Sequence, residues 1–296
     1  MLSRRHFLFH VSALAPSLAI GRDHTRQPLV IGLTPVILDD QLHFLREWQH
    51  WLEDQLQASV RFVQRLKYED ISEGVLNEQI DAAWICGFPY IRYRPRMQLL
   101  AVPRYKGQLT YHSYIITHRK LGQITRLEQL RDRVFAFSDP DSNSGYLYPT
   151  YRFMQLGIEP QQFFRRMFFT WAHRNTIDAV ASGLADAGSV DSYIWDEYGR
   201  YNPAVAKDIR VIERSPAFGF PPFIVRNTLA ARRMQQLSEI LLNMNNHPQG
   251  KQLLHQLGLD GFDAGDNALY AGIDEMWQQV SQQQALRFSD DAAVEL

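Results

Sequence analysis

Apolar and polar residues follow two periods in the first third of the chain, one of about two residues and one of about 3.6, which separate strands from helices. Apolar runs typical of buried strands lie at 28–34, 60–63 and 81–85, and stretches with helical spacing lie at 44–56 and 68–79. This order of strand, helix, strand, helix, strand predicts a doubly wound α/β unit.

The same order of elements starts again in the middle of the chain. Strand-like residues at 129–137 are followed by helical spacing at 176–182 and by an apolar run at 186–190. When Asp81 is aligned with Asp186, the preceding helices end in register and each Asp is followed by Ala. We expect two copies of one α/β lobe with a cleft between them, although a single open sheet would show the same periodicity.

The lobe boundaries follow from two interruptions of this pattern. The chain is expected to cross from one lobe to the other near 111–117 and to return near 209–225, where the Pro- and Gly-rich stretch 215–222 breaks the periodicity. Its tail again has helical spacing. The predicted lobes are therefore 28–113 together with 215–296, and 114–214.

The first residues carry an export signal rather than part of the fold. Arg4 and Arg5 stand in the sequence SRRHFL, which is close to the twin-arginine consensus, and an apolar run continues to Ala19. The run is too short to span a bilayer, and small residues precede a plausible cleavage point. We expect residues 1–21 to be a signal peptide and the mature protein to be periplasmic.

Charge excludes one class of partner. Without residues 1–21 the chain has 29 Lys and Arg against 32 Asp and Glu, a net charge of −3, which does not favour nucleic acid. After residue 21 the sequence contains no run of 18 apolar residues, so it predicts no membrane anchor. An anion would have to be bound by oriented local donors rather than by long-range attraction.

The segment 139–149, DPDSNSGYLYP, has the composition of an anion-binding turn. Ser142, Asn143 and Ser144 offer short hydrogen-bonding side chains, and Gly145 allows the backbone to approach a ligand closely. An ordinary helix N-cap would have a similar composition. The flanking elements favour a site, because a strand precedes the turn and a helix follows it, at 133–137 and at 147–156 before Gly157.

This arrangement resembles the phosphate-, phosphite- and phosphonate-binding periplasmic proteins, the PhnD-like solute-binding family. The resemblance extends from about residue 29 to about residue 277. The family's motifs correspond here to Tyr111-His112-Ser113, to Ser142-Asn143-Ser144-Gly145 with Pro149, to His173 before a helix, and to Gly183-Leu184-Ala185-Asp186-Ala187. One departure is Asn143, where the family usually has threonine.

The resemblance implies a type 2 periplasmic-binding-protein fold, with a mixed sheet flanked by helices in each of two lobes. It also implies a non-enzymatic monomer without a cofactor, which binds a small oxyanion and delivers it to an ABC importer. Neutral donors suit such a ligand because they avoid the cost of burying several charges. The expected ligand-binding residues are Tyr90, Tyr111, Ser113, Ser142, Asn143, Ser144, Gly145, His173 and Asp191.

Two aspartates near the predicted cleft have alternative roles. Asp186 is expected to cap a helix. Asp191 either caps a helix or contacts a positive group of the ligand, such as an amino group.

Cys86 is the single cysteine and leaves a second function open. A cysteine directly after a buried strand is commonly a small core residue packed behind a cleft. A thiol at the cleft floor would instead suit trivalent arsenic, as in arsenite-binding periplasmic sensors related to the phosphonate binders. The alternative function is therefore an oxyanion or arsenite sensor that signals to a membrane histidine kinase.

An exported cysteine-dependent enzyme is a third hypothesis with little support. A pair of Cys86 and His173 would need an orienting third group that the sequence does not identify, and the common hydrolase and P-loop motifs are missing. The histidine pairs His43/His50 and His112/His118 do not have the spacing of a metal site. No metal is expected.

Overall fold

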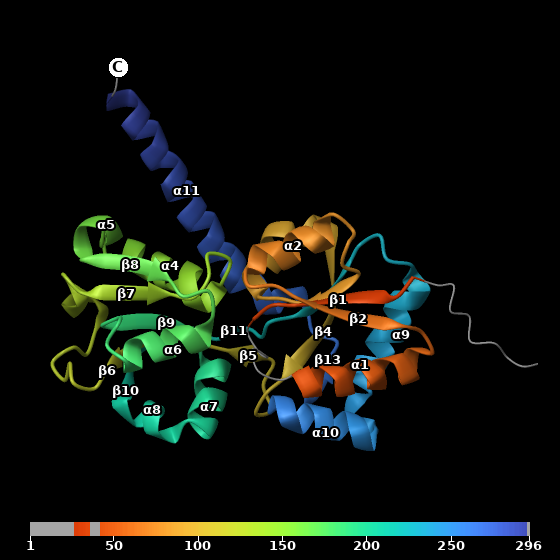
Figure 1. The fold of residues 1–296 in the computed structure, drawn as a ribbon. Helices are drawn as coiled ribbons and strands as arrows, with labels where there is room; N and C mark the ends of the chain where they lie inside the picture. The colour runs from red at the N-terminus through yellow and green to blue at the C-terminus, as the bar shows by residue number, and fades with distance from the viewer. Residues whose placement is uncertain (1–26, 36–41, 295–296) are drawn as a thin grey trace, which may run out of the picture.

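The computed structural model describes residues 27–35 and 42–294, so the predicted signal peptide lies outside the described residues. Figure 1 shows two α/β parts side by side, with the long C-terminal helix rising from between them. Each part contains one sheet with helices packed on it. The predicted α/β class with two lobes is confirmed.

The first sheet has six strands in the order β13-β4-β12-β3-β1-β2. Strands β1, β2 and β3 are parallel, whereas β12 runs antiparallel between β3 and β4. The sheet is therefore mixed. Its strands are β1 (Leu29–Leu33), β2 (Val60–Gln64), β3 (Ala82–Trp84), β4 (Met97–Arg104), β12 (Phe223–Arg226) and β13 (Gly261–Asp263). Its helices are α1 (Leu42–Leu56), α2 (Tyr68–Leu76), α3 (Gly87–Tyr93), α9 (Ala231–Leu242) and α10 (Pro248–Leu257).

The second sheet has five strands in the order β10-β6-β9-β7-β8. They are β6 (Ser113–His118), β7 (Val134–Phe137), β8 (Arg166–Phe169), β9 (Ala187–Asp191) and β10 (Ile209–Arg214). The helices of this part are α4 (Tyr148–Gln155), α5 (Pro160–Phe163), α6 (His173–Ala181), α7 (Ser192–Tyr201) and α8 (Pro203–Asp208). Its core is rich in phenylalanine.

A small antiparallel pair of strands lies where the chain passes between the two sheets. It joins β5 (Thr110–Tyr111) to β11 (Phe218–Gly219), and the second sheet is built within 113–214. The last helix, α11 (Ala271–Val294), packs against α3 on one side and α4 on the other. We keep the lobe boundaries stated above as a proposal, with α11 in contact with both lobes.

The internal repeat has a direct physical counterpart in the two sheets. The Asp81 carboxylate accepts a hydrogen bond from the backbone N–H of Val30 at 2.9 Å, and that of Asp186 accepts one from Val134 at 2.8 Å. Each aspartate thus ties its own strand to the neighbouring strand. The expectation that Asp186 caps a helix is wrong, because its carboxylate faces the sheet.

The turn before each aspartate is also repeated. Glu78 and Gly183 lie at equivalent positions and have positive φ angles of 60° and 79°. Their backbone N–H groups bond to the carbonyl oxygens of Val75 and Val180, which occupy equivalent places in the two helices. The two lobes therefore share their loop conformation as well as their order of elements.

Candidate functional site

The predicted anion-binding turn forms a single π-helical turn, η3 (Asn143–Leu147), which leads into α4. Such turns are rare and often lie at functional sites. Ser142 caps it: its hydroxyl oxygen accepts the backbone N–H of Gly145 at 2.9 Å. We call residues 142–147 the cradle. The Gly145 N–H, expected to face a ligand, thus has a partner within the cradle.

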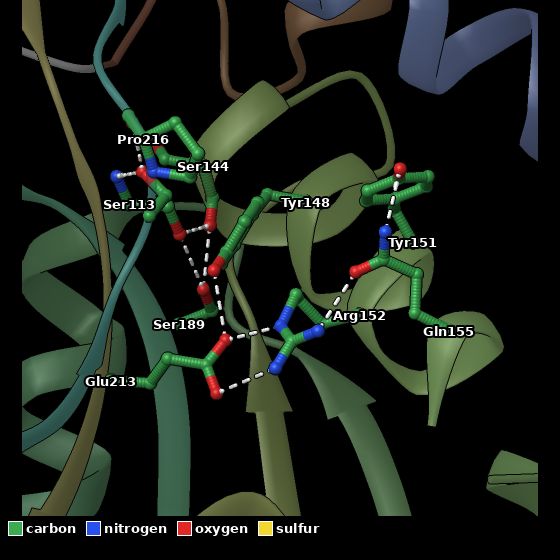
Figure 2. A network of polar contacts seen from close by, with 10 residues as sticks. Ser113, Ser144, Tyr148, Tyr151, Arg152, Gln155, Ser189, Glu213 and Pro216 are labelled. Carbon is green, nitrogen blue, oxygen red and sulfur yellow. Dashed lines mark hydrogen bonds and ion pairs between the residues drawn. The ribbon is translucent and has the colours of Figure 1, made fainter. Parts of the chain in front are cut away.

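Two hydroxyl groups hold the cradle from the sheet below (Figure 2). Ser113 Oγ and Ser189 Oγ lie 2.7 and 2.6 Å from the carbonyl oxygen of Ser144, to which both donate. Ser113 was expected to donate to the ligand. Its hydroxyl instead donates to the cradle backbone, which positions Ser144.

An ion pair fastens the helix that follows the cradle. Glu213 on β10 accepts hydrogen bonds from Tyr148 Oη at 2.8 Å and from Arg152 Nε at 2.7 Å (Figure 2). Both donors belong to α4. Side-chain contacts therefore fix the cradle to the sheet and also fix the helix that follows it, as a preorganised binding turn requires.

His173 begins α6, is fully buried and contacts Ser142 at the start of the cradle. Its Nδ1 accepts the backbone N–H of Asp191 at 3.2 Å, so the proton of the neutral ring is on Nε2, 3.4 Å from Ser142 Oγ. Ser138 Oγ lies 2.8 Å from the same Nδ1. Burial lowers the pKa of His173 to about 3, so the ring is uncharged at neutral pH. Its described contacts support the cradle.

Asp191 ends β9 and caps α7, where its carboxylate accepts the N–H of Tyr193 at 2.7 Å. Burial raises the pKa of this carboxyl to about 7. Of the two expected roles, the helix cap is present. The same carboxyl is close enough to raise the pKa values of Tyr68, Cys86 and Tyr111, so it also belongs to the cleft.

The first lobe contributes Cys86 and Tyr111 to the opposite wall. Cys86 Sγ accepts the backbone N–H of Asn143 at 3.2 Å, and Tyr111 Oη accepts Asn143 Nδ2 at 2.9 Å. Cys86 therefore faces the cradle, and the expectation that it packs behind the cleft is wrong. Burial raises the pKa of this thiol to about 12, which keeps it protonated.

Three buried polar side-chain atoms of the cradle and of α2 have no hydrogen-bond partner in the described part of the chain. They are Tyr68 Oη, Asn143 Oδ1 and Ser144 Oγ. Tyr68 is within electrostatic reach of Cys86 and Tyr111, both of which adjoin Asn143. Leaving such atoms unpaired costs about 1–3 kcal/mol each, so they are candidates for contact with a ligand.

Tyr68 is the site residue that sequence reasoning missed. It is the first residue of α2, just as His173 is the first residue of α6, and the two stand at equivalent positions of the internal repeat. The same equivalence relates Cys86 to Asp191, which precede α3 and α7. Aligning the two halves of the repeat at each candidate residue would have identified Tyr68 as the counterpart of His173.

Tyr90 is not brought together with the other expected residues. Its hydroxyl donates to Asn267 Oδ1, and its ring packs edge-on against Tyr270, with centroids 5.2 Å apart. No described hydrogen bond joins it to the cradle. A ligand-binding role for Tyr90 therefore has no support in this geometry.

Direct contacts hold the two lobes together around this site. Lys106 Nζ lies 2.6 Å from Asp196, and Tyr105 Oη donates to Glu197 at 3.1 Å. Nearer the cradle, Arg92 pairs with Asp141, while Asp139 accepts the backbone N–H of Tyr68 at 3.2 Å. Each contact joins a residue of the predicted first lobe to one of the second. The two predicted lobes are thus in direct contact beside the cradle.

Comparison with known proteins identifies the family. The family described as the periplasmic substrate-binding protein of phosphonate ABC transporters matches residues 31–270. The chain belongs to this phosphonate-binding family. The predicted resemblance is therefore confirmed over most of the chain.

Individual members of the phosphonate-binding family are distant in sequence. A protein of Prochlorococcus marinus, named a probable ABC-transporter phosphite-binding protein, is 22% identical over 78% of this chain and 82% of its own. The phosphonates-binding periplasmic protein of Escherichia coli is 25% identical over 77% of this chain and 70% of its own.

Solved structures share the fold. The binding component of a phosphonate ABC transporter from Pseudomonas aeruginosa has a TM-score of 0.80 at 22% identity, covering 88% of each chain. The P. marinus protein PhnD1 in complex with methylphosphonate has a TM-score of 0.77 at 21% identity, covering 86% of this chain and 98% of its own. This chain therefore has the same fold as these two solved binding proteins.

Family membership also bears on location and activity. Proteins of the phosphonate-binding family are periplasmic substrate-binding proteins of ABC transporters. In the described ranges, no helix combines the length and apolarity that a membrane span requires. The same residues contain no group of three or more His, Cys, Asp and Glu side chains placed to hold a metal ion.

Proposed function

We propose that this protein binds a small tetrahedral phosphorus oxyanion, a phosphonate, phosphite or phosphate-like ion, and presents it to the permease of an ABC importer. The observation that carries the proposal is the group of unpaired buried atoms at the cradle, Tyr68 Oη, Asn143 Oδ1 and Ser144 Oγ. They come from both lobes, so a ligand bonded to all three would hold the lobes together.

The site residues have two roles in this proposal. Ser144, Asn143 and Tyr68 contact the ligand, with Tyr111 and Cys86 lining the same space. The remaining expected residues position the cradle, because their polar atoms already have protein partners. These residues are Ser113, Ser142, Gly145, His173 and Asp191. The protein is expected to act as a monomer after export directed by residues 1–21.

Replacing Ser144 with alanine tests the direct contact. The variant removes one buried hydroxyl and keeps the backbone carbonyl that anchors the cradle. Loss of one hydrogen bond to a charged ligand costs about 1.5–3 kcal/mol, so calorimetric titration should show about 10- to 100-fold weaker binding of the best of methylphosphonate, phosphite and phosphate. Ser182→Ala, at the far end of α6, is the control and should bind as the parent does. Unchanged affinity in Ser144→Ala would remove the cradle hydroxyl from the site.

A second candidate function is a sensor for trivalent arsenic, and it is favoured by one observation, the position of Cys86 Sγ on the cradle. Thiols bind trivalent arsenic far better than oxygen ligands do. Titration of Cys86→Ser with arsenite and with phosphite separates the two functions. Phosphite binding within about tenfold of the parent supports the importer, whereas tight arsenite binding that the substitution abolishes supports the sensor.

The contact between Arg92 and Asp141 should set how readily the lobes close. Asp141→Asn keeps the shape of the side chain but removes the charge that meets Arg92 across the cleft. Because apparent affinity falls with the population of the closed state, we expect every ligand to bind about three- to tenfold more weakly, by a common factor. Asp274→Asn is the matched control, because Asp274 and its partner Arg94 lie in the same predicted lobe. A loss confined to one ligand would show that Asp141 acts on the ligand instead.

A further inference from the structure

The cleft around the cradle has no buried cation. Among the described residues, no lysine or arginine is buried, whereas the carboxylates of Asp139, Asp141 and Asp191 are. His173 is neutral because burial holds its pKa near 3. The cation that meets these carboxylates is Arg92, which is partly exposed and already pairs with Asp141. A fully ionised oxyanion would therefore gain little compensating positive charge, which is costly in a site shielded from water.

Asn143 has a buried acceptor, Oδ1, without a hydrogen-bond partner in the described part of the chain. Its backbone N–H donates to Cys86 Sγ at 3.2 Å, and one of the two hydrogens on its Nδ2 donates to Tyr111 Oη at 2.9 Å. A carbonyl oxygen can only accept a hydrogen bond, so it repels a bare anionic oxygen and requires a hydrogen from the ligand.

We propose that the site takes its oxyanion in a protonated form, with the ligand's own hydroxyl donating to Asn143 Oδ1. This inference rests on the proposed function and narrows it to the charge state of the ligand. Ser144 Oγ and Tyr68 Oη, which are hydroxyls, remain to donate to the ionised oxygens. Asn143 is in this view the residue that determines specificity.

Other titrating groups face Asn143 and must be separated from the ligand's proton. They are Cys86 before α3, Tyr68 at the start of α2, Tyr111 on β5, Asp139 before the cradle and Asp191 after β9, with His173 behind. Burial keeps the thiol and the phenols protonated up to high pH, since it raises their pKa values. Asp139, Asp141 and Asp191, whose pKa values burial raises, are therefore the protein groups that could hold or release a proton in the pH range of the test.

The decisive comparison uses two probes of nearly the same shape. Methylphosphonate monoanion and methanesulfonate carry the same charge, but the sulfonate has no hydroxyl. By calorimetry at pH 6 we expect methylphosphonate to bind at least 100-fold more tightly than methanesulfonate. Above the second pKa of the phosphonate, its affinity should fall about tenfold per pH unit, because the competent species disappears. Binding of methanesulfonate within a few fold, or a phosphonate affinity that is flat from pH 6 to 8.5, would overturn the inference.

Variants assign the effect to Asn143. Asn143→Thr replaces the acceptor with a hydroxyl that can also donate, so the preference over methanesulfonate should shrink to about tenfold or less. Asp191→Asn and Asp139→Asn can weaken both ligands, because these residues position the site, but the ratio of the two affinities and its pH dependence should persist. If either removed them, the proton would belong to that carboxyl and the assignment to Asn143 would be wrong. If no phosphorus oxyanion bound at any pH, the proposed function itself would fail, which is a distinct outcome.

Discussion

Replacing Gly145 with alanine is expected to abolish oxyanion binding, with a loss of at least 100-fold. A Cβ at this position would lie 2.5 Å from Ser138 Cβ and 3.0 Å from Ser142 Oγ. Ser138 cannot move aside easily, because it is fully buried and its hydroxyl donates to the carbonyl oxygen of Ser189 at 3.0 Å. The cradle must therefore shift away from the sheet.

The size of the expected loss follows from the number of contacts that the shift disturbs. Displacing the cradle moves both Asn143 and Ser144, and each lost hydrogen bond to a charged ligand costs about 1.5–3 kcal/mol. Calorimetric titration with phosphite and methylphosphonate gives the loss directly. Gly122→Ala is the control, because its nearest atom would be a backbone oxygen 3.8 Å away. Parental affinity in Gly145→Ala would show that the cradle does not depend on this close packing.

Asp191→Asn is expected to make the unliganded protein less sensitive to pH and more stable above pH 7. Burial raises the pKa of the Asp191 carboxyl to about 7, well above that of an aspartate in an unfolded chain. Asparagine keeps an oxygen that can accept the N–H of Tyr193, so the cap on α7 survives while the charge is removed.

The direction of the pH effect follows from proton linkage. Because the folded state holds this proton more tightly than the unfolded state, the stability contribution is greatest below the unfolded pKa, near 4, and is lost as the pH rises through about 7. Asp139, whose pKa burial raises to about 6, acts in the same direction. We expect the free energy of unfolding of the parent to fall by about 3 kcal/mol from pH 5 to pH 8, on account of Asp191 alone.

Urea unfolding at pH 5, 6.5 and 8 measures this slope for parent and variant. The control is Asp266→Asn, which removes the charge from an exposed cap that accepts the N–H of Ala268 at 2.9 Å. The control should leave the pH dependence unchanged. Parallel curves for the parent and Asp191→Asn would mean that Asp191 is ionised without cost in the folded protein.

The order of elements was predictable from sequence because the signals are local. Alternation and helical spacing mark β1 to β3 with α1 and α2 to within a few residues, and the residues SNSG mark the cradle. The repeated Asp-Ala pair indicated two copies of the lobe. The pair recurs because each copy has the same turn conformation before the aspartate and the same contact from its carboxylate. The fold class followed from these features and the family from the resemblance of the motifs, and both are confirmed.

Neighbours in space were not predictable in the same way. Periodicity assigns a residue to a face of a strand but does not identify the strand beside it, so the insertion of β12 between β3 and β4 left no local signal. The direction of the Ser113 hydroxyl likewise depends on a carbonyl 31 residues further along the chain. Its assignment as a ligand donor therefore could not be tested from spacing.

The sequence by itself thus determined two α/β lobes, the place of the cradle and the family, since each depends on residues close together in the chain. The tertiary structure alone decided how the site is assembled. Cys86 lies 57 residues from the backbone N–H that it accepts, and Tyr68 lies 71 residues from Asp139, its partner across the cleft. Such pairs join residues that are far apart in the chain, so only the tertiary structure could show that they are neighbours.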